Sequence, residues 1–77
     1  MLNKKFSNTE DQQITDALSV AFNALKEKGY EPINQLSGYI LSNDEHYLTS
    51  YNNTRKLMTA CDHEEILKHL LRYYFEN

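Results

Sequence analysis

The residue types best suited to chemistry gather around Cys61, Asp62, His63 and His69. A thiol beside an imidazole can serve as nucleophile and base, and the same side chains can ligate a metal ion. Cys61 and His63 lie two residues apart, however, and this spacing does not put two side chains on one helical face. Structural zinc needs four ligands, usually as two close pairs, and the sequence offers one loose pair. We therefore predict no catalytic residue, no metal site and no cofactor, with Cys61 buried and the histidines at the surface.

Glu65 and His69 are four residues apart, which places them on the same face of a helix. The spacing predicts an exposed charge pair that contributes a few tenths of a kcal/mol.

The elements that must position these residues are organised around residues 29–41, which hold both glycines and the only proline. Gly29 can close a helix in the left-handed conformation, and Pro32 suits the first turn of the next helix. We predict a helix over 32–41, in which Gly38 offers a flat place for close approach of another backbone. Its apolar residues recur at spacings of three and four: Ile33, Leu36, Tyr39 and Ile40.

Before this stretch, a capping sequence at 9–12 precedes a long segment with apolar residues at spacings of three and four. Acidic residues lie in its first turn and lysines in its last, which suits the helix dipole. We predict the longest helix over 10–28, with a flexible leader over 1–8 and a single helical domain over 9–77.

After the central helix, residues 42–45 have turn chemistry, and 46–50 leave strand and loop open. Asn52 or Asn53 is expected to cap a short helix over 54–61. The side chains of this helix that are expected to be buried are Leu57, Met58 and Cys61.

The last helix is expected to begin after Asp62, with Glu65 reaching back to the cap, and to end near Phe75. So much apolar surface on a terminal helix exceeds what one small layer can cover, which indicates a second protomer. The side chains expected in its buried stripe are Ile66, Leu67, Leu70, Leu71 and Tyr74, with Tyr73 and Phe75 beside them.

Length and composition also indicate a second protomer. A chain of 77 residues has room for one modest core, burying only about 60% of its unfolded surface. Six Tyr and three Phe are a large aromatic load for it, and tyrosine is favoured at interfaces. We predict an all-α, compact bundle of about four helices that forms a homodimer; tyrosines at the rim of a monomer core are the alternative. The interface candidates are Tyr30, Ile33, Leu36, Tyr39, Ile40, Leu70, Tyr73 and Tyr74.

Charge and hydropathy argue against a nucleic-acid-binding protein and a membrane-spanning protein. The net charge is −3, from eleven acidic and eight dispersed basic residues, so a phosphate-backbone partner is not expected. No apolar run has membrane-spanning length, and a single reduced Cys fits the cytoplasm. Our first hypothesis for the function is a non-enzymatic regulatory module that works by binding other proteins. The alternative is a small nucleic-acid-binding regulator that uses 32–41 and 54–61 as a helix-turn-helix-like pair.

Three strings carry a family resemblance: G-Y-x-P-I-N-Q-x-x-G-Y-x-L-S at 29–42, N-N-x-R at 52–55, and Y-Y at 73–74. With them the chain resembles the IreB family of small bacterial regulatory phosphoproteins. The resemblance implies a compact helical homodimer without catalytic activity, cytoplasmic in Gram-positive bacteria. It also implies a substrate of a transmembrane Ser/Thr kinase with a partner phosphatase, acting in cell-wall stress and antibiotic-resistance signalling.

The leader departs from the family pattern, in which a threonine precedes a Lys-Phe-like pair, because residues 1–6 contain no hydroxyl side chain. Ser7 and Thr9 are the nearest candidates for phosphorylation. A phosphate on Thr9 would meet the positive end of a helix dipole, although the acidic residues Glu10 and Asp11 oppose it. The alternative is that Thr9 is a plain cap.

Asn53 and Arg55 fall in the N-N-x-R string, where the family has Ala at the position of Thr54. Arg55 could present a fork of donors to a partner's carboxylate or phosphoryl group. The alternative is that Arg55 ties its helix to the 42–45 turn. Thr54 is expected on a helix surface.

Overall fold

The computed structural model describes residues 9–76, so the predicted leader over 1–8 lies outside it. The prediction of an all-α fold with four helices is confirmed for these residues, which contain no strand. The elements are α1 (Thr9–Glu27), α2 (Pro32–Ser42), α3 (Thr54–Thr59) and α4 (His63–Glu76), with two single-turn 3-10 helices, η1 (Glu45–Tyr47) and η2 (Tyr51–Asn53).

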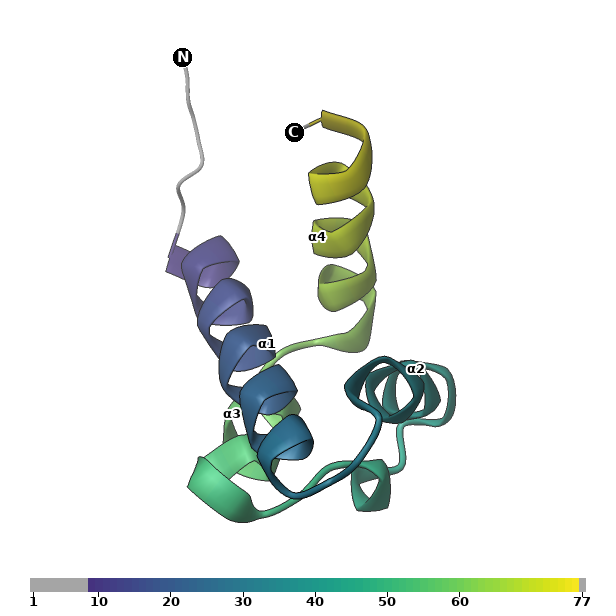
Figure 1. Cartoon of the computed structure of the whole chain (residues 1–77). Helices are drawn as coiled ribbons and strands as arrows, with labels where there is room; N and C mark the ends of the chain where they lie inside the picture. Colours follow the sequence, from purple (N-terminus) through teal and green to yellow (C-terminus); the bar gives the residue numbers. More distant parts are fainter. Residues whose placement is uncertain (1–8, 77) are drawn as a thin grey trace.

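Helix α1 is the centre of the fold, because it packs against α2, α3 and α4 (Figure 1). Small residues on its buried face let neighbouring helices come close, and the face is wide enough for three of them. The buried residues of this face are Ile14, Ala17, Ala21, Ala24 and Leu25.

The core around α1 takes side chains from almost every other element. They include Leu48 after η1, Met58 in α3 and Ile66 in α4. Tyr39 belongs to the same core: it is 1% exposed, and burial, with the Glu45 and Cys61 charges nearby, raises the pKa of its hydroxyl. Tyr39 therefore has almost no exposed surface that a partner could contact, and it is not an interface candidate in this structure.

The predicted boundary between α1 and α2 is confirmed. Gly29 has φ +87°, the left-handed geometry that ends α1. Pro32 opens α2, and the Glu31 carboxylate accepts a hydrogen bond of 3.0 Å from the Ile33 amide. At the other end, Asn43 takes the left-handed conformation and its amide donates to the Tyr39 carbonyl.

The segment between α2 and α3 forms turns, which settles the open choice at 46–50. The Asp44 carboxylate accepts from the His46 amide at 2.9 Å and lies 2.9 Å from His46 Nδ1. These bonds hold the pKa of Asp44 below its ordinary value. Asn52 and Asn53 then both adopt positive φ, 57° and 61°, a conformation that asparagine tolerates better than most residues.

The entry into α3 differs from the prediction. Asn53 precedes the helix, but its side chain makes no capping hydrogen bond. Thr54 is fully buried instead of lying at the surface, and its hydroxyl donates to the Tyr51 carbonyl at 2.7 Å. In α3, Met58 is buried as expected, whereas Leu57 is 36% exposed.

Gly38 makes room for a side chain rather than for a backbone. The ring of Tyr47 in η1 lies directly against it, so a methyl group at Gly38 would overlap the ring. The Gln35 amide donates to the Tyr47 carbonyl at 2.9 Å and helps to hold η1 against α2. The glycine is therefore required by its neighbour, since its own φ is ordinary for a helix.

Gly38→Ala is expected to destabilise the protein by about 1 kcal/mol, because displacing the ring outweighs the better helix propensity of alanine. In a Tyr47→Ala background the same substitution should be stabilising, since only the propensity gain remains. Urea unfolding of the four chains of this double-mutant cycle measures both effects. The same sign in both backgrounds would show that the ring does not require the glycine.

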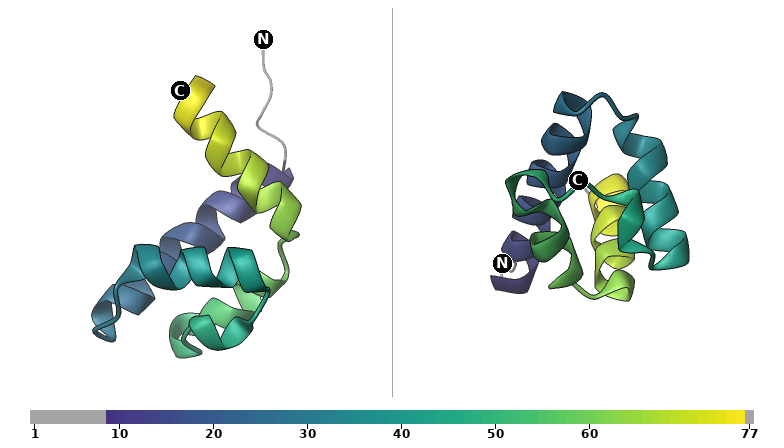
Figure 2. Two further views of the ribbon diagram at one scale, coloured as in Figure 1. Left: turned by 90° about the vertical axis from the view of Figure 1, so that its right-hand side faces the viewer. Right: turned by 90° about the horizontal axis from the view of Figure 1, so that it is seen from below.

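The C-terminal part of helix α4 projects from the other helices. Its C-terminal turns extend past the first turn of α1 along the long axis, in the view of Figure 1 and in the left view of Figure 2. Ile66, near its start, is the buried residue of this helix. Most of α4 is thus attached to the fold along one narrow edge.

Candidate functional site

The exposed face of α4 is the main candidate site. The sequence predicted that most of its apolar residues would be buried, but apart from Ile66 they are exposed in the protomer, because α4 meets α1 along only one edge. Tyr74 and Phe75 are 79% and 75% exposed, and their rings pack edge to face with centroids 4.9 Å apart. We call Leu67, Leu70, Leu71 and Tyr74, which lie at helical spacings of three and four, the apolar stripe.

An apolar groove adjoins this stripe between α1, α2 and α4. Leu70 belongs to both, so the groove and the stripe form one continuous surface. Ser19 and Asn23 add a polar edge on the α1 side. The apolar residues of the groove are Leu18, Phe22, Ile33, Leu36 and Leu70.

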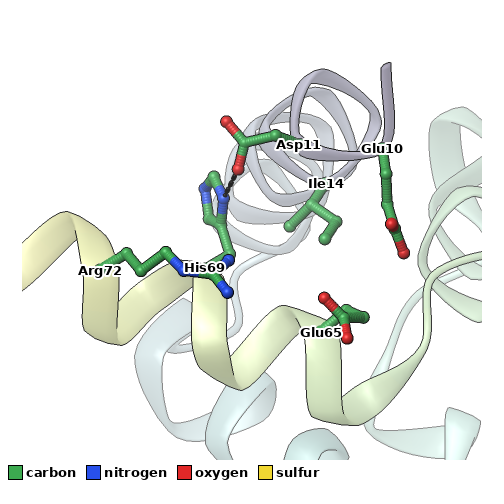
Figure 3. A pocket seen from close by; sticks show the side chains of 6 residues that line it. All are labelled: Glu10, Asp11, Ile14, Glu65, His69 and Arg72. Atoms are coloured by element: carbon green, nitrogen blue, oxygen red, sulfur yellow. Dashed lines mark hydrogen bonds and ion pairs between the residues drawn. The ribbon is translucent and has the colours of Figure 1, made fainter. Parts of the chain in front are cut away.

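Helix α4 is held to the start of α1 by His69 (Figure 3). His69 Nδ1 lies 2.6 Å from the Asp11 carboxylate, and its other ring nitrogen lies 3.4 Å from the Thr15 hydroxyl. The predicted Glu65–His69 pair is thus wrong: the imidazole turns to α1, and Glu65 approaches Lys68 at 4.0 Å. This contact between α4 and α1 helps to set the direction in which the apolar stripe faces.

A second histidine holds α4 to the end of α2. His63 Nδ1 lies 3.2 Å from the Ile40 carbonyl, and the ring packs on Tyr39 with centroids 4.5 Å apart. Because a carbonyl can only accept, Nδ1 is the donor in this hydrogen bond. Nε2 is buried and has no hydrogen-bond partner among the described residues.

Cys61 and His63 line one shallow hollow, together with Asp62. They do not form a nucleophile and base, because each bonds to a backbone carbonyl: the thiol to that of Leu57 at 3.6 Å and the imidazole to that of Ile40. Burial, with a smaller effect of the Glu10 charge, raises the pKa of the thiol and disfavours a reactive thiolate. Within residues 9–76, no three His, Cys, Asp or Glu side chains gather to hold a metal ion.

Arg55 ties α3 to the preceding turns. Its Nε donates to the carbonyls of Glu45 at 3.1 Å and Leu48 at 3.2 Å. This is the structural alternative considered for Arg55, although the contact reaches η1 and Leu48 rather than the whole 42–45 turn. Asn53 beside it is exposed.

The other candidates fall in three groups. Ser7 lies outside the described residues, and Thr9 is described only as the first residue of α1. Leu36 and Ile40 are half-buried against the core. Five interface candidates are exposed: Tyr30, Ile33, Leu70, Tyr73 and Tyr74. The exposed apolar side chains also include four that were not interface candidates: Phe22, Leu67, Leu71 and Phe75. Helical spacing had assigned the last three to the final helix.

No helix among residues 9–76 combines the length and the apolar character needed to cross a bilayer. Fold and surface together define a class of small all-helical proteins in which a broad apolar stripe lies exposed beside a shallow groove.

Comparison with known proteins assigns the family. The chain matches the family described as IreB regulatory phosphoprotein over residues 2–76. It is 42% identical over 73 residues to a "UPF0297 protein" of Ruminiclostridium cellulolyticum, covering 95% of this chain and 83% of that protein. It is also 42% identical over 64 residues to a "UPF0297 protein" of Lachnoclostridium phytofermentans, covering 83% and 73%. The protein belongs to the IreB family of regulatory phosphoproteins, which confirms the resemblance found in its sequence.

Proposed function

We propose that the protein is a non-enzymatic regulator that acts through protein–protein binding as a homodimer. The exposed face of α4 carries this proposal. An aromatic side chain has roughly 150–250 Å² to bury, and Tyr74 and Phe75 are mostly exposed. The leucines of the stripe and the groove beside them extend this exposed apolar surface, and a contiguous exposed apolar patch typically marks an interaction site.

Regulation is proposed to come from phosphorylation by a transmembrane Ser/Thr kinase and its reversal by a partner phosphatase, in the cytoplasm, during cell-wall stress. Membership of a regulatory phosphoprotein family supports this. Thr9 is our first candidate and Ser7 the second. Thr9 opens α1, two residues before the Asp11 carboxylate that pairs with His69. A phosphate there would alter the charge next to the contact that holds α4.

Asn53 and Arg55 remain candidate contacts for a further partner. Arg55 uses Nε for the fold, and its two terminal nitrogens make no hydrogen bond with the described residues. They could receive a partner's carboxylate or phosphoryl group.

Nucleic-acid binding is the less favoured alternative. The net charge is −3, and residues 43–53 separate α2 from α3, a longer link than the three or four residues of a helix-turn-helix.

The proposal is tested by measuring mass and phosphorylation on the same preparation. Light scattering at micromolar concentration should give twice the 9.1 kDa chain mass. After incubation with the cognate kinase, phosphopeptide mass spectrometry should find phosphate on Thr9 or Ser7, and Thr9→Ala with Ser7→Ala should abolish it. A mass of one chain would contradict the dimer, and the absence of phosphate from both Ser7 and Thr9 would rule out phosphorylation at these sites.

A further inference from the structure

We propose that two copies of the chain pair through their α4 helices in antiparallel orientation, about a two-fold axis beside Leu70 and Leu71. Each Tyr74 then packs on Leu67 of the other copy. This inference rests on the proposed dimer and specifies how the two α4 helices meet.

The spacing of the stripe provides the first argument. Leu67, Leu70, Leu71 and Tyr74 repeat at three, one and three residues, so the pattern reads the same in both directions. A stripe symmetric about its centre matches itself when a second helix runs the opposite way. Leu67 then faces Tyr74, while Leu70 and Leu71 face each other across the axis.

Exposed apolar side chains on this face of α4 supply surface that a second copy can bury. Stable interfaces bury about 800 Å² on each partner. Leu67 and Leu71 are about half exposed, and Tyr74 and Phe75 more than that. The groove extends this surface through Phe22 and Ile33, so the second copy can also cover side chains of α1 and α2.

The helix dipoles favour the antiparallel orientation. The first turn of α4 carries Glu64 and Glu65. In a parallel pair these carboxylates would lie beside their counterparts, and the two helix dipoles would also repel. In the antiparallel pair the first turn of each helix lies beside the last turn of the other, so the dipoles attract, while Glu65 lies near Glu76 of the other copy.

The position of α4 allows this arrangement. Its C-terminal turns project past the first turn of α1 in Figure 1 and in the left view of Figure 2, and Tyr74 is 79% exposed in its own protomer. The start of α4 is fixed to α2 through His63, and its middle to α1 through His69. The stripe is thus presented on a helix whose direction is already set.

Disulfide cross-linking tests the pairing. We would compare three single substitutions, Leu67→Cys, Leu71→Cys and Tyr74→Cys, under mild oxidation and on non-reducing gels. The wild-type chain, whose only thiol is buried, is one control. Leu41→Cys on α2, at an 88% exposed position, is the other.

In the antiparallel pair, positions 67 and 67 are offset by about 10 Å along the axis, and so are 74 and 74. A disulfide tolerates at most about 7 Å between α carbons. We therefore expect Leu71→Cys alone to form linked dimers, and Leu67→Cys with Tyr74→Cys to link only when the two chains are refolded together.

Self-linking of Leu67→Cys and Tyr74→Cys would show a parallel pair and overturn the inference. Absence of any specific link in chains that light scattering shows to be dimeric would overturn it too, while leaving the dimer intact. A monomeric mass for the wild-type chain would instead remove the proposed dimer itself.

Discussion

Leu71→Glu is expected to convert the proposed dimer into a monomer at micromolar concentration. Leu71 lies next to the proposed two-fold axis, so each dimer would bring two carboxylates together in an apolar contact. Like charges brought together in an interface cost several kcal/mol, and each carboxylate also loses its hydration. We expect the dissociation constant to rise at least about 100-fold, which is about 2.7 kcal/mol.

The matched control is Leu41→Glu, the same substitution on the exposed side of α2, where the side chain is 88% exposed. Sedimentation equilibrium over a range of concentrations gives the dissociation constant of each variant. Circular dichroism at the same concentrations shows whether α1 to α3 remain folded. If Leu71→Glu dimerises as well as Leu41→Glu, then the face of α4 is not the interface.

Leu25→Ala is expected to cost about 3 kcal/mol of unfolding free energy, within the range of roughly 2–5 kcal/mol for truncating a buried leucine. Leu25 is 0% exposed and lies in the last part of α1, the helix that all the others contact. In a domain this small, 1 kcal/mol corresponds to about 4–8 °C in Tm, so the variant should melt more than ten degrees lower.

Leu41→Ala removes the same atoms from an exposed position and should change the free energy of unfolding by less than about 0.5 kcal/mol. Urea unfolding at one fixed protein concentration gives both variants the same contribution from dissociation, so the difference between them reports the loss of packing. Equal losses for Leu25→Ala and Leu41→Ala would contradict the burial of α1.

Local rules were enough to predict most helix boundaries. Gly29 and Pro32 act on their own backbone, so the end of α1 and the start of α2 follow from residue type alone. Periodicity likewise predicted α4. The paired positive φ of Asn52 and Asn53 was not predicted, because the same residues are also good helix caps and spacing does not separate the two uses.

The locations of Tyr39 and Leu67 could not be predicted from spacing. Leu36, Tyr39 and Ile40 share one face of α2, and the crossing of α2 with its neighbours decides that Tyr39 is the buried one. Leu67 shares the apolar face of α4 with Ile66, but the direction of α4 leaves it exposed. That direction depends on the contact of His69 with Asp11, 58 residues away in sequence.

The narrow attachment of α4 has a consequence for the abundance of the protein. An isolated helix of 14 residues is only marginally stable in water. If the other copy supplies the packing of the turns after His69, ordering of these turns and assembly become one event, which follows mass action. At a low concentration the protein would be mostly monomeric, and its C-terminal turns would be open to proteases. At a high concentration dimerisation would protect these turns.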